Sequence, residues 1–274
     1  MEHGAFDAVD RYNGLRVGQA LGKSFAIWFK NLPAFLLLST VAYSPNIIYT
    51  AVVTSGSLSL ADLGEWSVYS IVSTLVGFLL LLTACAAILY GVIQQLRGHR
   101  AGIGESLGVG LKRLLPALGV GILCFLAVCG WIFVGSFFAA LIPLVGFLFG
   151  IAGFVASLIS ICKLFVAVPA SVIERPGIVG ALRRSKELTH GYRGRIFLIL
   201  LLLVAIFVAM AILGFTMNTG DEWTEAGIKL FMWIQTALSI VWTSLTATVM
   251  GVVYHDLRAI KDGVGAEELA RVFE

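Results

Sequence analysis

Apolar residues along the chain are gathered into six long stretches, and short polar segments separate them. A helix crosses the hydrocarbon core of a bilayer with about 20 apolar residues, and every stretch reaches that length. The stretches lie near residues 32–54, 67–95, 115–138, 143–169, 196–215 and 228–254. The pattern therefore predicts an all-α, polytopic membrane protein with six transmembrane helices.

Three of the connecting segments carry apolar residues at the three- and four-residue spacing of one helical face. The stripes are Val17, Leu21, Ser24, Phe25, Trp28 and Leu32; Ile103, Leu107, Leu111, Leu114 and Leu118; and Ile178, Leu182, Ser185, Leu188 and Tyr192. Basic residues flank the stripes, which suits a helix beside anionic headgroups. We expect helices that lie on the membrane surface and also pack inward. A collar packed only on the ends of the spanning helices, or loops, are the alternatives.

A four-residue pattern recurs after every second stretch: a basic residue, a spacer, a glycine and a β-branched aliphatic residue. It occupies 100–103 (Arg-Ala-Gly-Ile), 175–178 (Arg-Pro-Gly-Ile) and 261–264 (Lys-Asp-Gly-Val). Internal repetition fixes the unit of architecture. We expect one integral membrane domain over 1–274, built from three repeats of an amphipathic interfacial helix and a helix pair, related by a pseudo-threefold rotation. The repeats cover about 14–98, 99–174 and 175–256, and a cytoplasmic tail covers 257–274.

Prolines and glycines mark the expected irregularities within the helices. Pro45 should kink the first stretch and Pro169 the fourth, because proline lacks the N–H that a helix needs. Gly146, Gly150 and Gly153 have the small-residue spacing that lets a neighbouring helix approach closely.

The glycines of the recurring pattern should mark turns. Gly102, Gly177 and Gly263 each follow a stretch by a few residues, where the chain must bend from the membrane normal toward the surface. Glycine reaches positive φ without steric cost. Valine should therefore be tolerated worse at Gly177 than at Gly153, which lies within a helix.

Composition agrees with this organisation. Hydrophobic residues make up 59% of the 274 residues and charged residues 13%, against about 25% charged in soluble domains. The mean hydropathy is +0.95. Acidic residues at 2, 7 and 10, with no apolar core among the first 30 residues, indicate that no cleavable signal peptide precedes the first stretch.

The placement of basic residues predicts the orientation. Of the 19 lysines and arginines, only Lys229 lies at the opposite end of the helices and only Lys163 lies inside one; all others fall on one side. The positive-inside rule makes that side cytoplasmic. We expect a multi-pass protein of the bacterial inner membrane with both termini in the cytoplasm.

The sequence offers no enzyme signature. Residues 18–24 (Gly-Gln-Ala-Leu-Gly-Lys-Ser) resemble a phosphate-binding loop, but only three residues separate the glycines where the motif has four. The four cysteines lie in apolar stretches without metal spacing, and the four histidines are scattered. We expect no enzymatic activity, no catalytic or metal site, no cofactor and no nucleic-acid partner.

Two features are candidate binding residues. Lys163 is a charge inside the fourth stretch, where it can snorkel to the headgroups, pair with another helix or contact a substrate. The second feature is a cluster of basic residues that either sets topology or binds phosphate or lipid headgroups. The cluster consists of Arg183, Arg184, Lys186, Arg193 and Arg195.

Two segments resemble a bacterial membrane family. They are 179–189 (Val-Gly-Ala-Leu-Arg-Arg-Ser-Lys-Glu-Leu-Thr), followed by Arg-Ile-Phe at 195–197, and 253–258 (Val-Tyr-His-Asp-Leu-Arg) with Lys-Asp-Gly at 261–263. The chain resembles the membrane domain attached to some glycerophosphodiester phosphodiesterases and found in stand-alone inner-membrane proteins. The resemblance implies a six-helix membrane module. The phosphodiesterase itself is a separate soluble barrel that has no counterpart in this sequence.

The sequence predicts a non-enzymatic membrane scaffold or accessory subunit. Its expected partners are membrane lipids, with anionic headgroups on the cytoplasmic side, and a second copy of the chain or a membrane protein complex. The alternative is a small-molecule or lipid transporter built on the repeat, although the stretches hold few polar groups beyond Asn46, Lys163 and the pair Gln94 and Gln95.

Overall fold

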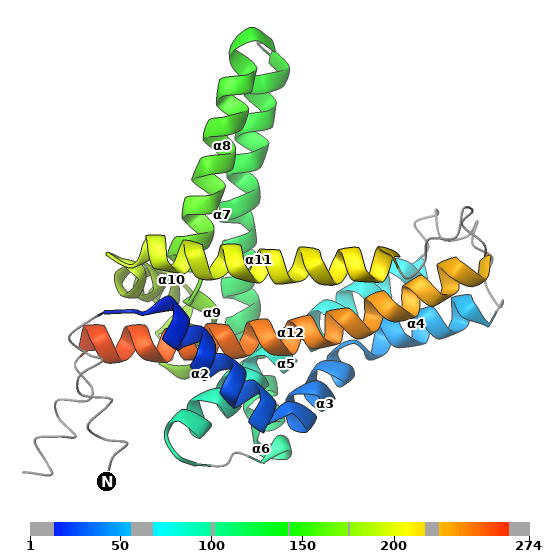
Figure 1. The fold of residues 1–274 in the computed structure, drawn as a ribbon. Helices are drawn as coiled ribbons and strands as arrows, with labels where there is room; N and C mark the ends of the chain where they lie inside the picture. The colour runs from blue at the N-terminus through cyan, green and yellow to red at the C-terminus, as the bar shows by residue number, and fades with distance from the viewer. Residues whose placement is uncertain are drawn as a thin grey trace, which may run out of the picture. The chain divides into compact units, whose positions relative to one another are not determined.

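A computed structural model describes residues 14–55, 68–99, 102–141, 143–174, 176–216 and 225–262. Throughout these ranges the regular elements are α-helices and no strand occurs, so the predicted all-α class is confirmed (Figure 1). The helices are α2 (Val17–Lys30), α3 (Leu32–Ala42), α4 (Ser44–Thr54), α5 (Val68–Leu96), α6 (Ile103–Lys112), α7 (Leu114–Leu141), α8 (Pro143–Leu164), α9 (Ala167–Ile173), α10 (Gly177–Thr189), α11 (Arg193–Thr216) and α12 (Glu225–Asp262).

The predicted apolar stretches coincide with helices. They correspond to α3 with α4, α5, α7, α8 with α9, α11 and α12. Within the described residues, five helices are long and apolar enough to cross a membrane; a sixth span is possible if α2 and α3, which meet at 83°, count as one broken helix. The chain therefore has the helices of a multi-pass membrane protein.

The helix is interrupted about one turn before each of the two prolines that were expected to kink it. α3 ends at Ala42 and α4 begins at Ser44, where Pro45 cannot supply the N–H that would bond the carbonyl four residues earlier. α8 ends at Leu164 and α9 begins at Ala167, and this break likewise falls about one turn before Pro169. The missing proline N–H explains why each break lies on the N-terminal side of its proline.

Two compact units make up the chain, and each is built from separate parts of the sequence. The first unit contains Met1–Lys23, Leu115–Ile199 and Met250–Glu274; the second contains Ser24–Leu114 and Leu200–Val249.

In the first unit α7 and α8 run antiparallel as a hairpin (Figure 1). A Cβ atom added to Gly153 would lie 2.6 Å from the carbonyl oxygen of Trp131, and one added to Gly135 would lie 2.9 Å from that of Phe149. Gly150, by contrast, faces open space. The predicted close helix approach is confirmed at Gly153, where a valine side chain would meet the backbone of α7.

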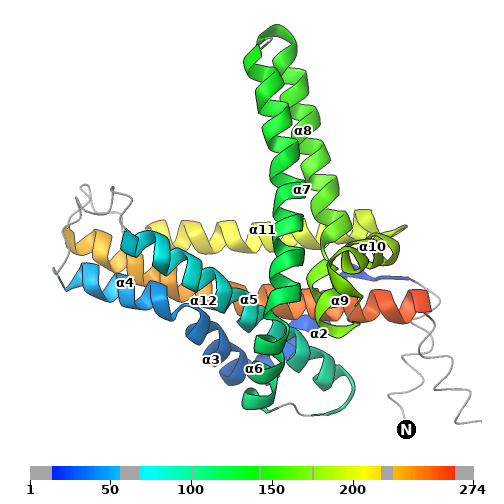
Figure 2. The same ribbon diagram turned by 180° about the vertical axis from the view of Figure 1, so that it is seen from behind.

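The second unit contains the second half of α2, helices α3, α4, α5 and α6, most of α11 and the first part of α12 (Figure 2). Polar bonds join these segments across long sequence separations. Nε1 of Trp28 donates to Oγ of Ser244 at 2.9 Å, and the hydroxyls of Tyr43 and Thr243 lie 3.1 Å apart. Such bonds satisfy polar groups that the apolar helices would otherwise leave without partners.

The three predicted amphipathic segments are helices α2, α6 and α10, so the loop alternative is wrong. Their buried faces carry small residues. The buried positions are Ala20, Ser24 and Trp28 in α2, Ser106 and Gly110 in α6, and Ala181, Ser185, Leu188 and Thr189 in α10. In α6 the predicted apolar stripe is exposed instead, at Ile103, Leu107 and Leu111. In α6 the small side chains let the helix lie close to its neighbour, while these large apolar residues remain on the outside.

The predicted turn glycines differ from one another. Gly177 has φ +76° at the start of α10, which confirms the expectation there. Gly102 caps the start of α6 in an extended conformation with φ −67°, and Gly98 has the positive φ (+79°) in that connection. The expectation of positive φ is therefore wrong for Gly102, because the turn is made four residues earlier. Arg100, Arg175 and Gly263 lie outside the described residues.

Exposure along the long helices is consistent with a lipid environment. Only 11% of the most apolar 18-residue window of α7 is buried, and 17% of that of α11. Exposed residues of α7 include Phe125, Phe133 and Phe137. A soluble protein rarely exposes contiguous apolar surface on this scale.

Candidate functional site

α10 is attached to the end of α8 through a backbone carbonyl. The hydroxyl of Ser185 donates to the carbonyl oxygen of Lys163 at 2.8 Å, and Oγ1 of Thr189 lies 3.3 Å from the same oxygen. α8 ends one residue later, at Leu164, so this carbonyl belongs to the last turn and lacks an intrahelical donor. Ser185, Leu188 and Thr189 are fully buried. The break between α8 and α9 thus positions α10.

Glu174, which follows the last residue of α9, is the centre of a charged cluster. Its carboxylate accepts a hydrogen bond from Nε of Arg184 at 2.8 Å and another from the hydroxyl of Tyr254 at 2.7 Å. Nε of Arg258 lies 3.8 Å away. The Glu174 side chain is only 17% exposed. A carboxylate this far from water requires such partners.

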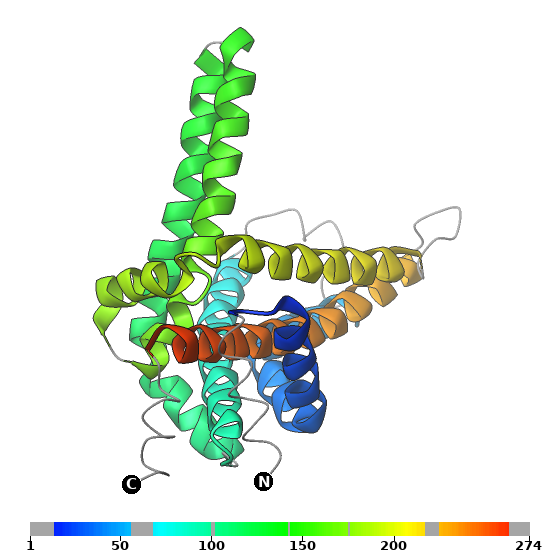
Figure 3. The same cartoon turned by 60° about the vertical axis from the view of Figure 1, so that its left-hand side comes forward.

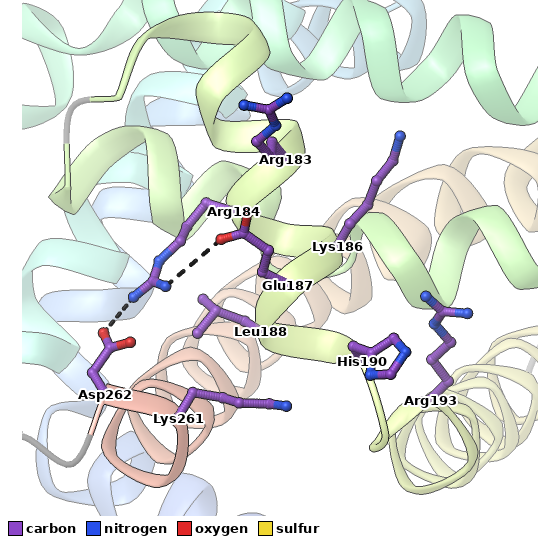
Figure 4. Close-up of a pocket in the computed structure, with 9 residues that line it drawn as sticks. All are labelled: Arg183, Arg184, Lys186, Glu187, Leu188, His190, Arg193, Lys261 and Asp262. Carbon is purple, nitrogen blue, oxygen red and sulfur yellow. Dashed lines mark hydrogen bonds and ion pairs between the residues drawn. The ribbon is translucent and has the colours of Figure 1, made fainter.

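Arg184 extends the cluster to the last turn of α12. Its other nitrogens bond to Asp262 and lie 4.0 Å from Glu187. Figure 4 shows the Arg184 side chain directed at Asp262, and Figure 3 shows α10 (yellow-green) beside the end of α12 (red). Burial opposes the charge of Arg184, but the bonds to Glu174 and Asp262 outweigh it and raise its pKa above the ordinary value. Arg184 is therefore a structural connection between α9, α10 and α12.

An open hollow of about 590 Å³ lies beside this cluster. Four of the six predicted binding residues line it, on α10 and at the start of α11. The complete lining is Arg183, Arg184, Lys186, Glu187, Leu188, His190, Arg193, Lys261 and Asp262. Arg183 and Lys186 point away from Asp262 in Figure 4. Arg184 and Asp262 neutralise each other, so the positive charge of the hollow comes from Arg183, Lys186, Arg193 and Lys261, against one further carboxylate in the lining, that of Glu187.

The two remaining predicted residues lie outside the lining. The guanidinium of Arg195 lies 5.6 Å from the centre of the Tyr192 ring, and the ammonium of Lys261 lies 5.7 Å from the same ring. Cations at such distances are attracted to an aromatic face. Tyr192 therefore connects Arg195 to the edge of the hollow. Lys163, half-buried on α8, contacts α10 through its backbone carbonyl.

Glu174 and Asp262, the carboxylates of the site, were not predicted. The length of the last helix is nevertheless a signal for Asp262. α12 has 38 residues, which is about 57 Å of helix against a hydrocarbon core of about 30 Å. The predicted tail at 257–274 therefore begins inside α12, which runs on to Asp262 because its last turns pair with the cluster. Glu174 gives no signal, because two of its partners, Tyr254 and Arg258, come from α12, 80 or more residues further along the chain.

This arrangement fits an anion better than a metal ion. Arginine and lysine donate hydrogen bonds to phosphate oxygens, and the hollow presents several such donors together. Among the described residues, no group of histidine, cysteine, aspartate and glutamate could hold a metal ion. Comparison of the chain with protein families, characterised proteins and solved structures finds no match.

Proposed function

We propose that the chain is a non-enzymatic membrane scaffold or accessory subunit that holds the headgroups of anionic phospholipids. The hollow beside α10 is the observation that carries this proposal. Arg183, Lys186, Arg193 and Lys261 surround it, and Glu187 is the one described carboxylate of the lining besides Asp262, which Arg184 already engages. A phospholipid phosphate would supply the missing negative charge, at about 1 kcal/mol for each basic residue near the membrane surface.

The proposal includes six spans in the bacterial inner membrane, with both termini and the hollow on the cytoplasmic side. Charge asymmetry along the sequence supports this orientation. Tyr192 supports a place for the hollow at a membrane interface, because a tyrosine with adjacent cations is typical of the interfacial belts. Residues past the hydrocarbon end of α12 would meet headgroups there.

The order of the helices and the burial of matching residues support the three-repeat arrangement. α2, α6 and α10 each precede a pair of long apolar segments. The first small residue of each buried face occupies a matching place in its repeat. These residues are Ala20, Ser106 and Ala181, which are 1%, 3% and 0% exposed.

Lipid binding is tested by removing charge from the hollow. Arg183, Lys186 and Arg193 are changed together to glutamine, and the purified protein is weighed by native mass spectrometry with phosphatidylglycerol or cardiolipin added. The matched control changes Arg97, Lys112 and Arg113 to glutamine, which removes the same charge from the second unit. We expect the hollow variant to lose most bound anionic lipid and the control to retain it.

Equal losses of bound anionic lipid in the two variants would show that the basic residues act only as general surface charge. That result would overturn the proposed site. We expect the wild type and the hollow variant to bind zwitterionic phosphatidylcholine equally, because a lipid without net charge does not need the excess cations. Loss of phosphatidylcholine together with the anionic lipids would instead indicate that the variant no longer folds.

Transport is the alternative function, and the break between α3 and α4 favours it, because discontinuous helices form substrate sites in transporters. A flux assay in sealed vesicles distinguishes the two functions. A scaffold gives no protein-dependent lipid or solute movement, whereas a transporter moves its substrate at a rate proportional to the protein content.

A further inference from the structure

The basic hollow of the first unit carries more positive charge than one phosphate can balance. Its described lining holds five arginines and lysines against the carboxylates of Glu187 and Asp262. With His190 neutral, these described residues have a surplus of three positive charges. A phosphodiester carries a single negative charge, so a ligand with one phosphate would leave cations of the hollow without a counter-charge, which is unfavourable wherever the ligand displaces water.

Two of the surplus cations lie together on α10. Arg183 and Lys186 stand three residues apart, and that spacing places them on one face of the helix. Both side chains point away from Asp262 (Figure 4). Arg183 and Lys186 are called the α10 pair below.

The other two cations come from different helices and meet beside Tyr192. Arg193 begins α11, and Lys261 belongs to the last turn of α12. The ammonium of Lys261 lies 5.7 Å from the centre of the Tyr192 ring, and Arg193 is the next residue in the chain. Arg193 and Lys261 are called the α11–α12 pair. Each pair therefore contains one arginine and one lysine.

Arg193 also has a polar atom that the described part of the chain leaves without a partner. Its Nε is buried and makes no hydrogen bond to any described residue. A buried donor in that state is costly. An anion bound in the hollow beside the same guanidinium would offset this cost, because arginine binds phosphate through charge-assisted hydrogen bonds.

We propose that the hollow binds one ligand with two phosphate groups on a short polyol linker, with one phosphate at each pair. The inference rests on the proposed function and names its lipid class, which is cardiolipin, in which a glycerol joins two phosphates. A soluble polyol bisphosphate has the same chemistry and is the other source of such a ligand. In each pair the arginine can donate two parallel hydrogen bonds and the lysine supplies a point charge. Basic pockets on the cytoplasmic side of spanning helices are places where cardiolipin headgroups bind.

The hollow is large enough for linked phosphates, and the linkage has a measurable consequence. Its volume of about 590 Å³ lies within the range of small-ligand sites, roughly 300–1,000 Å³. Once the first phosphate is bound, the second is held beside its own pair, so its contact adds affinity without a separate binding event. Two phosphates competing for a single position would favour cardiolipin over phosphatidylglycerol only about twofold, by number alone. The ratio of the two affinities therefore shows how many phosphates are held.

The test measures the affinities of cardiolipin and phosphatidylglycerol for the full chain in detergent by native mass spectrometry. We expect the wild type to prefer cardiolipin by about tenfold to thirtyfold, because each of two additional basic contacts contributes about a factor of five. A second arm titrates the same protein, without added lipid, with glycerol bisphosphate. A preference for cardiolipin identifies a lipid ligand, and binding of glycerol bisphosphate alone identifies a soluble one.

Two double variants each remove one pair. Arg183→Gln with Lys186→Gln removes the α10 pair, and Arg193→Gln with Lys261→Gln removes the α11–α12 pair. In both variants the preference for cardiolipin should fall to about twofold, while phosphatidylglycerol still binds at the remaining pair. Affinity for glycerol bisphosphate should fall in both variants as well.

The matched control is Lys112→Gln with Arg113→Gln, which removes the same charge from the second unit and should keep the preference. Thermal unfolding of each variant checks that it is folded. Both residues of the α10 pair are exposed, so their removal should leave the fold intact. The α10 variant therefore decides the inference even if the α11–α12 variant unfolds.

A wild-type preference for cardiolipin of about twofold or less would overturn the inference and leave the proposed binding of anionic lipids intact. Loss of both lipids from one double variant, with the other unchanged, would also overturn it, because a single phosphate would then be held. If the wild type binds neither anionic lipid, the proposed function fails. In that case binding of glycerol bisphosphate that weakens in both double variants would still support two phosphate positions, and absence of that binding would refute them.

Discussion

Nε of Arg184 lies 2.8 Å from Oε2 of Glu174, and this contact joins α10 to the residue that ends α9. Asp262 holds the opposite side of the same guanidinium. An arginine expected to bind external anions is thus already engaged by carboxylates of the chain itself. The neighbouring Arg183 and Lys186 remain the stronger candidates for a ligand.

Removing the charge of Glu174 should destabilise the first unit. Glu174→Gln leaves Arg184 and Arg258 near a neutral amide, and breaking a largely buried pair costs about 3 kcal/mol. We expect a clear fall in the unfolding temperature, read by tryptophan fluorescence in detergent. Glu187→Gln is the control, since Glu187 is 59% exposed and 4.0 Å from Arg184. Equal falls for both variants would contradict the central role of Glu174.

Valine at Gly153 should separate α7 from α8. The added Cβ would lie 2.6 Å from the Trp131 carbonyl, and backbone cannot move aside as a flexible side chain can. Overpacking of this kind costs about 1–3 kcal/mol. We expect the yield of monodisperse protein in size-exclusion chromatography to fall for Gly153→Val and to remain for Gly150→Val, which meets open space. The reverse order would refute the packing of the hairpin.

Alanine substitutions at Gly177 and Gly102 distinguish the effect of backbone conformation on stability from the effect of steric crowding. Neither has an atom within 4 Å of an added Cβ, but only Gly177 has a positive φ. Alanine at positive φ costs about 1–2 kcal/mol. Gly177→Ala should therefore lower the unfolding temperature, while Gly102→Ala should leave it nearly unchanged. A similar fall at Gly102 would mean that φ is not the cause.

Ser185→Ala should loosen α10 from α8. The substitution leaves the Lys163 carbonyl with only the longer contact to Thr189, and an unsatisfied buried acceptor costs about 1–3 kcal/mol. Hydrogen exchange of the α10 amides should become faster. Ser160→Ala is the comparison, because that hydroxyl bonds only the Ala156 carbonyl in its own helix. Unchanged exchange in Ser185→Ala would show that the contact does not hold the helix.

Orientation is tested by labelling single cysteines. In a variant without the four native cysteines, cysteine at position 57 or 219 should react with a membrane-impermeant maleimide added to intact cells, and cysteine at Lys186 should react only after lysis. The expectation follows from the basic asymmetry of the sequence. Labelling of Lys186→Cys in intact cells would reverse the proposed topology.

The positions of the helices could be predicted from the sequence, because the length of an apolar stretch and the effect of a proline on its own helix are both local properties. Pro45 and Pro169 break helices through their own missing N–H groups, so no tertiary information is needed. The packed faces of the amphipathic helices were harder to predict. Large apolar residues such as Leu111 do not mark the packed face of α6; they are exposed, and the close contact is made at Gly110.

The charged cluster was predictable only in part. The basic residues of α10 are adjacent in sequence, and their concentration is visible there. Glu174 and Asp262 stand 88 residues apart in the chain, and only the fold brings both of them to Arg184. Whether an arginine is free or paired depends on such long-range partners.

The tight contact between α7 and α8 also bears on how the chain is made. A single residue connects the two helices, and from 114 to 164 the sequence has one charged residue, Lys163, close to the end where α8 finishes. The two helices can therefore leave the translocation machinery together as a preformed pair whose tip carries no charge across the bilayer. Gly135 and Gly153 would allow that pair to close during synthesis, before the cluster around Glu174, which needs α12, can assemble.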